Sequence, residues 1–369
     1  MTAHFQHLGI FSDWVSAADT HGHIHPNAAP GAETRHRIRE VVGFSHAPAV
    51  PREVRIDRTW TRDGVVGEEV SWSVGYGPRT TAWVLRPTQS RGSLPGVLAL
   101  HSHDGYKYFG KEKIADGPAG AVQELTPLRD KTYQGRAFAN ALAARGFVVL
   151  VHDVFLWGSR RFSLETMPES IRDRATALDG IELYNAVARD HEHLVSKYCS
   201  VLGTTLAGVV AYEDRVALAY LQSRPDVLPT KIGTIGLSGG GCRAALLQAT
   251  SDNVAATVVV GMMTTYAGLL DDHLHQHTWM FVPPGLATIA DWPDLAASAA
   301  PTPLLVQYNR HDPLFSLEGM QSAHARIESH YASIGHPEAY VGEFYDGPHK
   351  FDLHMQDSAF TWLALNLHL

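Results

Sequence analysis

From Pro95 onward, short and nearly continuous apolar runs alternate with helical patterns, and few folds accommodate that arrangement. Unbroken apolar runs are typical of strands that are buried on both faces, as in parallel sheets. Helices between such strands form right-handed crossovers that cover both faces of one sheet. The pattern therefore predicts a mostly parallel α/β sheet. Its runs are GVLALHSH (96–103), FVVLVHD (147–153), KIGTIGLS (231–238), VAATVVVG (254–261), PLLVQYNRHD (303–312) and AYVGEFYDG (339–347).

Three β-like segments precede this region, at residues 52–62, 67–77 and 80–87. The second segment alternates apolar and polar residues, which is typical of a half-buried strand. Turn-forming residues stand between the segments, Asp63-Gly64 first and Gly77-Pro78 second. We expect an antiparallel meander at the start of the sheet.

The spacing of these elements also predicts the domain organisation. Residues 1 to about 50 are rich in His, Pro, Ala and Gly without a sustained period, and we expect an irregular N-terminal arm there. Residues 51–369 then form one main domain. Two connections within it, about 154–203 and 262–300, are too long for simple crossovers. Insertions of this length commonly serve as lids or substrate walls.

Composition and charge exclude several classes of protein. The net charge of −8 gives no support for a nucleic-acid partner, because a phosphate-binding surface needs an excess of Lys and Arg. The two cysteines share no metal-binding or disulfide spacing. No apolar run is long enough to span a membrane, and the N-terminal residues MTAHFQHLGIFSDW lack the pattern of a signal peptide. We expect a soluble cytoplasmic protein of unknown oligomeric state.

The stretch GLSGG at residues 236–240 fits the pattern G-x-S-x-G between a strand and a helix. This turn forces the serine backbone into a strained conformation, which requires flanking residues without side chains that would collide. Gly236 and Gly240 occupy those two places. The turn would present the Ser238 hydroxyl at the carboxyl end of the sheet as a nucleophile. A glycine-rich structural turn is the alternative.

A serine nucleophile needs a base, and the base needs a carboxylate to orient it, in the chain order Ser, acid, His. Asp312 ends the apolar run 303–312, although it could equally open a turn before Pro313. His349 follows the last predicted strand on a loop. The weaker alternatives are Asp271, Asp272 and Asp291 in the second insertion and His354 in the terminal helical pattern.

The sequence HSHD at residues 101–104 lies where the oxyanion loop of such an enzyme belongs. One donor would be the N–H of Gly239, and the other that of His103 or Asp104. His101 would then be a packed, hydrogen-bonded histidine. The competing interpretation is a metal site, because HGHIH (21–25) and HLHQH (273–277) also place imidazoles at alternate positions.

Substrate-binding residues should come from the two insertions. Aromatic side chains there could form an apolar wall, and Arg160 could bind a carboxylate or a hydroxyl-rich group. Packing of the insertions on the body, and pairing of Arg160 with an acidic residue such as Glu165, are the alternatives. The aromatic candidates are Trp157, Trp279 and Phe281.

Together these motifs resemble the α/β-hydrolase superfamily, and within it the acetyl xylan esterase and dienelactone hydrolase group. The resemblance covers about residues 80–365, and YLQSRPDVLPTKIGTIGLSGGG, residues 220–241, is its most characteristic part. It implies the α/β-hydrolase fold and the triad Ser238, Asp312 and His349, with no metal and no cofactor. The HG pair usual after the third strand of the group is His101-Ser102 here.

The expected function is that of a serine-dependent carboxylic ester hydrolase that forms an acyl-enzyme. Its partner would be a small-molecule ester, with acetylated and other carbohydrate esters among the candidates. Three alternatives stay open at this point: a metal-dependent hydrolase that uses the histidine clusters, a serine peptidase on the same fold, and a non-catalytic binding protein.

Overall fold

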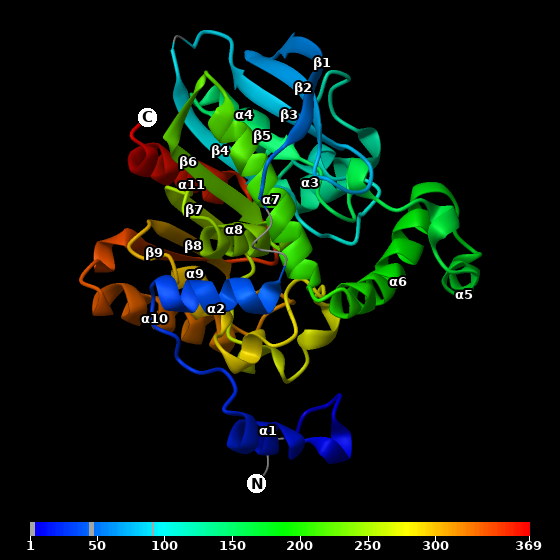
Figure 1. The fold of residues 1–369 in the computed structure, drawn as a ribbon, viewed down its shortest axis with the longest axis vertical. Helices are drawn as coiled ribbons and strands as arrows, with labels where there is room; N and C mark the ends of the chain where they lie inside the picture. The colour runs from blue at the N-terminus through cyan, green and yellow to red at the C-terminus, as the bar shows by residue number, and fades with distance from the viewer. Residues whose placement is uncertain (1–3, 44–47, 91) are drawn as a thin grey trace.

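The apolar runs form one continuous sheet in the computed structural model, which describes residues 4–43, 48–90 and 92–369. Within these ranges the nine strands are β1 (Arg52–Arg62), β2 (Val65–Ser73), β3 (Thr80–Pro87), β4 (Leu94–Leu100), β5 (Val148–His152), β6 (Val227–Leu237), β7 (Ala256–Val260), β8 (Leu304–Asn309) and β9 (Tyr340–Tyr345). They lie in the order β1-β2-β3-β5-β4-β6-β7-β8-β9 (Figure 1). The pairs from β1 to β3, and the pair of β3 with β5, are antiparallel, and all other pairs are parallel. The predicted mostly parallel sheet with leading antiparallel strands is confirmed.

Helices cover both faces of this sheet (Figure 1). The α-helices of the described residues are α1 (Trp14–Gly22), α2 (Ala32–Val42), α3 (Thr126–Tyr133), α4 (Phe138–Ala144), α5 (Glu169–Arg172), α6 (Gly180–Val201), α7 (Leu206–Ser223), α8 (Gly239–Thr250), α9 (Trp292–Ala297), α10 (Leu317–Ser333) and α11 (Leu353–Leu367). Along β4, Leu98 and Leu100 pack into one hydrophobic cluster with α7 and α8, and Val97 and Ala99 into another with α4 and α11. Since alternate residues of a strand point to opposite faces, both faces of β4 are buried.

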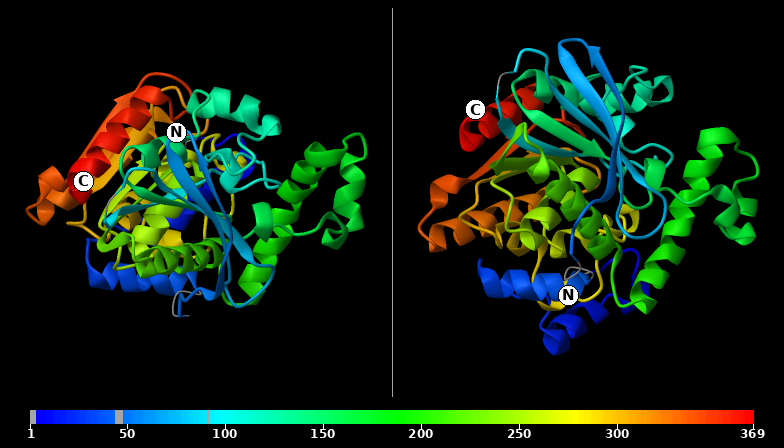
Figure 2. Two further views of the ribbon diagram at one scale, coloured as in Figure 1. Left: turned by 90° about the horizontal axis from the view of Figure 1, so that it is seen from above. Right: turned by 45° about the horizontal axis from the view of Figure 1, so that its top comes forward.

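Both predicted insertions contain helical segments. In the first, α5 and α6 extend away from the body as an arm (Figure 2). The second contains three short 3₁₀ helices and α9. Among the described helices, none alone is long and apolar enough to span a membrane. α6 and α7 have a sufficient length and apolar composition only when taken together, and the two helices are bent by 85° relative to each other.

The N-terminal segment, expected to be irregular, contains α1 and α2. α2 buries Ile38 and Val42 completely against the body, and Arg35 in the same helix donates a 2.6 Å hydrogen bond to the carbonyl of Ser251. α1 lies at one end of the molecule, away from the sheet (Figure 1). Charged residues on both sides of Ile38 make the helical spacing of apolar residues in α2 hard to recognise from the sequence. The helix is stabilised mainly by its tertiary contacts. Residues 1–3 and 44–47 of the expected arm lie outside the described residues.

Candidate active site

Ser238 connects β6 to α8 with φ 57° and ψ −121°, a conformation that side-chain-bearing residues rarely adopt. The flanking glycines make this turn possible. A Cβ added at Gly236 would lie 2.3 Å from the backbone carbon of Gly240, and one added at Gly240 would lie 2.1 Å from the carbonyl oxygen of Leu100. The Ser238 N–H donates a 2.8 Å hydrogen bond to Val260 at the end of β7. The half-buried Ser238 side chain therefore stands at the carboxyl end of the sheet.

Asp312 and His349 are joined directly. The Nδ1 atom of His349 lies 2.6 Å from Oδ2 of Asp312, whose side chain is buried. Asp312 Oδ1 also accepts a hydrogen bond from the N–H of Leu314. Asp312 therefore has two roles: it stabilises the turn after β8, and it orients the imidazole ring of His349. A carboxylate beside Nδ1 keeps the proton on that nitrogen and leaves Nε2 as an acceptor.

The Nε2 atom of His349 is buried without a hydrogen-bond partner in the described part of the chain. Gly261, directly after β7, lies close to both His349 and the residue before Ser238. A Cβ added at Gly261 would be 3.3 Å from the His349 ring and 2.9 Å from the side chain of Leu237. Ser238 and His349 thus lie at the same end of β7. Within the described residues no hydrogen bond joins the two side chains.

The loop after β4 reaches the turn at Ser238 through His103. A Cβ added at Gly239 would lie 2.7 Å from the backbone nitrogen of His103, and the three atoms nearest to it all belong to His103 rather than to Asp104. Of the two donors considered, the N–H of His103 is therefore the one beside Gly239. The N-terminus of α8, with its positive partial charge, starts at the same place.

Lys113, which the sequence patterns did not single out, holds the backbone of this loop. Its ammonium donates to the carbonyl oxygens of Ser102, at 2.8 Å, and His103, at 3.0 Å. Lys113 is fully buried, and burial lowers its pKa to about 8 despite the nearby Asp104 carboxylate.

His101, at the start of the same loop, is buried, with its Nδ1 atom 3.1 Å from the Ser102 carbonyl oxygen. Burial, with Arg243 and Lys113 nearby, lowers the pKa of His101 well below its usual value.

The aromatic candidates for substrate binding lie in different surroundings. Trp157 is buried, with its ring edge-on to His103 at 5.2 Å between ring centres. Phe281 is buried and stacks on Trp292. Trp279 is 37% exposed, and its indole N–H donates to His193 on α6. Trp157 thus lies at the loop after β4, Trp279 bridges the two insertions, and Phe281 belongs to the packing of the second insertion.

Arg160 is paired inside the protein, and with a partner other than Glu165. Its guanidinium is buried, lies 2.5 Å from Oε1 of Glu213 on α7, and donates to the carbonyl of Tyr76. A buried guanidinium engaged in this way has no free face for a substrate carboxylate. Arg161 lies over the ring of Tyr108, 4.2 Å from its centre.

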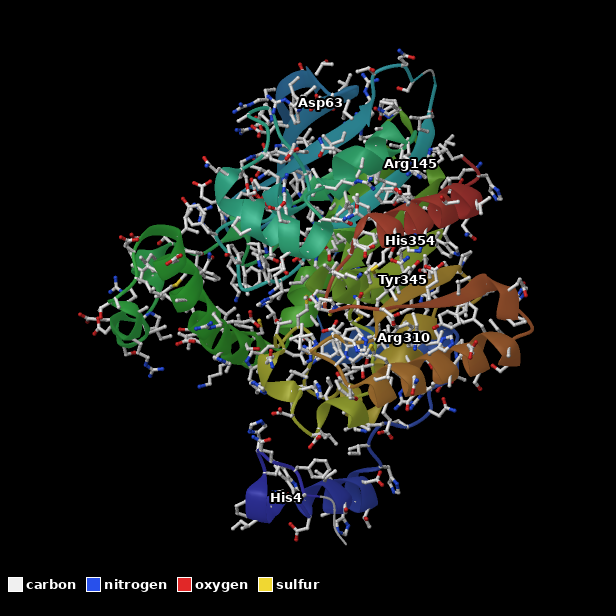
Figure 3. All side chains as sticks on the ribbon, turned by 180° about the vertical axis from the view of Figure 1, so that it is seen from behind. His4, Asp63, Arg145, Arg310, Tyr345 and His354 are labelled. Atoms are coloured by element: carbon white, nitrogen blue, oxygen red, sulfur yellow. The ribbon has the colours of Figure 1, made fainter. Side chains whose placement is uncertain are left out.

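The alternative triad residues make other contacts. Asp291 caps α9 by accepting a hydrogen bond from the N–H of Trp292. Asp272 pairs with His7 of the N-terminal arm, and Asp271 lines the pocket described below. His354 lies on α11 with its ring 5.4 Å from that of Tyr345 (Figure 3).

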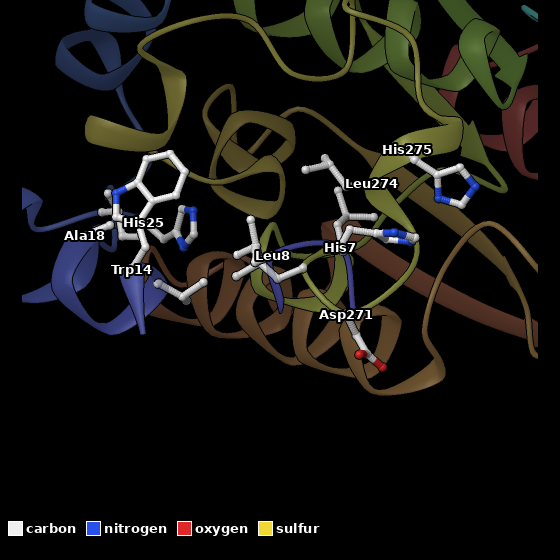
Figure 4. Close-up of a pocket in the computed structure, with 12 residues that line it drawn as sticks. His7, Leu8, Trp14, Ala18, His25, Asp271, Leu274 and His275 are labelled. Atoms are coloured by element: carbon white, nitrogen blue, oxygen red, sulfur yellow. The ribbon is translucent and has the colours of Figure 1, made fainter. Parts of the chain in front are cut away.

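The histidine-rich segments do not converge on HSHD. Among the described residues, one group of three could hold a metal ion, His7, Asp272 and His275, and all three are exposed. It takes one histidine from HLHQH and none from HGHIH or HSHD. His7 and His275 also border a pocket of about 380 Å³ between the N-terminal arm and the second insertion, with Leu8, Trp14 and Leu274 (Figure 4).

Comparison of the sequence with known proteins finds one relative along most of the chain. No protein-family model matches the chain. The protein YtaP of Bacillus subtilis (strain 168), provisionally named a hydrolase, is 26% identical over 312 residues, which cover 84% of this chain and 90% of YtaP.

Two solved structures are similar over most of both chains. Acetyl xylan esterase 1 from Thermoanaerobacterium sp. has a TM-score of 0.59 and 14% identity, and the match covers 94% of this chain and 96% of the esterase chain. The glucuronoyl esterase from Solibacter usitatus has a TM-score of 0.63 and 13% identity, and covers 90% and 91%. The α/β-hydrolase fold and the likeness to acetyl xylan esterases are thus confirmed at the level of the fold.

Proposed function

We propose that this protein is a serine-dependent carboxylic ester hydrolase with the triad Ser238, His349 and Asp312. The observation that carries the proposal is a serine on a strained turn at the same strand end as an imidazole whose Nε2 is free and whose Nδ1 is bonded to a buried carboxylate. An imidazole held in this tautomer can accept a proton from the serine. Without substrate the serine–histidine contact is often long, and it tightens in the Michaelis complex.

In the proposed mechanism His349 Nε2 takes the hydroxyl proton of Ser238 while Oγ bonds to the ester carbonyl carbon. The N–H groups of Gly239 and His103 stabilise the tetrahedral oxyanion at the start of α8. Collapse of this intermediate breaks the bond to the alcohol oxygen, which receives the proton from His349. Water, deprotonated by His349, then attacks the acyl-enzyme. Collapse of this second intermediate breaks the bond to Ser238 Oγ, which takes the proton back from His349, and the carboxylic acid leaves.

We propose a small ester as the substrate, with acetylated and other carbohydrate esters first among the candidates. The likeness of the fold to an acetyl xylan esterase and a glucuronoyl esterase supports this choice. Trp279, whose side chain is partly exposed, is the proposed contact for the acyl or sugar group, whereas Trp157 is buried beside the loop after β4. The lack of a free guanidinium at Arg160 argues against recognition of an acidic substrate by that residue.

The test uses nitrophenyl esters of increasing chain length beside acetylated sugars, with Ser238→Ala as the variant and Ser200→Ala, an exposed serine on α6, as the matched control. We expect Ser238→Ala to lose roughly a thousandfold or more in kcat/KM, because members of a triad fail nearly as a unit. Ser200→Ala should retain the parent rate.

The same assay separates the alternatives. Inactivation by a fluorophosphonate without an effect of chelators supports the serine mechanism, whereas loss of activity with a chelator supports the metal-dependent hydrolase. Faster turnover of peptide anilides than of esters supports the peptidase. Equal rates for Ser238→Ala and the parent would contradict the proposal.

A further inference from the structure

The carboxylate of Glu192 is a point of contact for three segments that are distant in the sequence. Glu192 lies on α6 in the first insertion and is 5% exposed. One of its oxygens, Oε2, contacts the ring Nε2 of His103 at 3.0 Å and forms a close ion pair with the ammonium of Lys107. The other, Oε1, accepts hydrogen bonds from the Thr278 hydroxyl at 2.6 Å and the Trp279 N–H at 3.0 Å. The first insertion, the loop after β4 and the second insertion thus meet at one carboxylate.

The hydrogen bonds of the His103 ring determine how the carboxylate acts on the loop. The N–H of Gly105 donates to His103 Nδ1 at 3.1 Å, so Nε2 carries the ring proton and donates it to Glu192. The backbone nitrogen of the same residue is the atom that faces Gly239. Glu192 therefore holds the side chain whose main chain supplies the proposed oxyanion donor.

Buried ion pairs add little net stability, because desolvation offsets most of their attraction. Lys107 is 1% exposed and Glu192 only slightly more. Burial disfavours the charge of Glu192, yet Lys107 and His103 outweigh it and hold the pKa of the carboxyl well below its usual value. The carboxylate is thus charged at neutral pH, and its most direct structural effect is to orient the groups that bond to it.

We propose that Glu192 is a positioning residue of the esterase site, which holds the loop after β4 so that the His103 and Gly239 N–H groups face the same oxyanion. The proposal rests on the proposed function and adds to it that the two insertions are coupled to transition-state stabilisation. Since the oxyanion forms only during reaction, loss of this alignment affects kcat more than KM.

The experiment compares the parent with Glu192→Gln, which keeps the size of the side chain and removes its charge. We expect kcat for nitrophenyl acetate to fall roughly 10- to 100-fold, less than the roughly 100- to 1000-fold cost of deleting an oxyanion donor. KM should change less than threefold. The inhibition constant of a trifluoromethyl ketone, which forms a tetrahedral oxyanion adduct, should rise by a factor similar to the fall in kcat.

The inhibition constant separates positioning from folding. A variant that only folds poorly contains less active enzyme, which lowers apparent kcat but leaves the inhibition constant of the remaining enzyme unchanged. The double variant Lys107→Met with Glu192→Gln removes the unpaired buried ammonium and should recover thermal stability without recovering kcat. Glu182→Gln, an exposed position on the same helix, is the matched control and should behave as the parent.

The proposal is overturned if both Glu192 variants bind the ketone within twofold of the parent. Failure of the proposed function itself is a different result, because Ser238→Ala would then hydrolyse the ester as fast as the parent and the parent would not bind the ketone.

Discussion

The chemistry proposed for individual residues depends on the protonation state of one imidazole. Asp312 keeps the proton of His349 on Nδ1 through the 2.6 Å contact. Asp312→Asn offers an amide in place of the carboxylate and favours the wrong tautomer, so we expect kcat to fall by roughly four orders of magnitude with little change in unfolding temperature. Asp291→Asn, which keeps a side-chain oxygen to cap α9, should leave kcat near that of the parent. Similar rates for the two variants would contradict the role of Asp312.

The charge of Lys113 should make kcat depend on pH. Burial places its pKa at about 8, so the ammonium that holds the carbonyls of Ser102 and His103 is present below that pH and is lost above it. The groups that act on it are Asp104, Arg243, Glu112 and Lys107. We expect kcat to fall reversibly as the pH rises through about 8, and Lys113→Met to have a low kcat without this limb.

Stability should move in the opposite direction. Between pH about 8 and 10.5, the ordinary pKa of lysine, the unfolded chain binds the proton that the folded protein has released. The contribution of Lys113 to stability therefore rises with pH in this window. Denaturant unfolding of the parent and Lys113→Met across it measures the difference. A parent kcat that is flat through pH 9 would contradict the role of the ammonium.

At the scale of elements, β4 packs directly against the turn at Ser238 and the start of α8. There is no space between them for a side chain at Gly240. A Cβ at Gly240 meets the backbone oxygen of Leu100, which cannot move without displacing β4. We expect Gly240→Ala to destabilise the protein by about 3 kcal/mol or more in urea unfolding. Gly22→Ala, whose Cβ meets only an ordinary contact at 3.4 Å in α1, should stay within about 0.5 kcal/mol or become slightly more stable. Equal stability of the two variants would show that the turn can relax.

The elements that sequence patterns predict best are those with local signals. β1 and β3 have the predicted bounds, 52–62 and 80–87, because turn residues flank them. α6 was missed although its buried residues Tyr184, Val187, Ala188 and Val195 recur at helical spacing. The chain order of the motif put forward Asp312 and His349, and their side chains lie 2.6 Å apart. The contacts of Glu192 and Lys113 join segments through tertiary packing, for which no local pattern exists.

At the scale of the whole molecule, the N-terminal segment divides into two parts with different roles. α2 packs on the body through Ile38 and Val42, whereas α1 lies at one end with Trp14 65% exposed. Removal of residues 1–23 should leave activity and unfolding temperature close to those of the full chain. Removal of residues 1–43 takes away two fully buried side chains, each worth roughly 1.5–3 kcal/mol, and should lower the unfolding temperature by roughly 5 °C or more. Equal melting of the two truncated proteins would contradict this division.

The central claim is that Ser238 carries the acyl group during turnover. The direct measurement is rapid acid quenching of the enzyme during hydrolysis of nitrophenyl acetate, followed by mass spectrometry of its peptides. We predict one added acetyl group on the peptide that contains Ser238, formed at the rate of the initial burst of nitrophenol. Steady turnover with no acetylated peptide, or with the acetyl group on another residue, would contradict it.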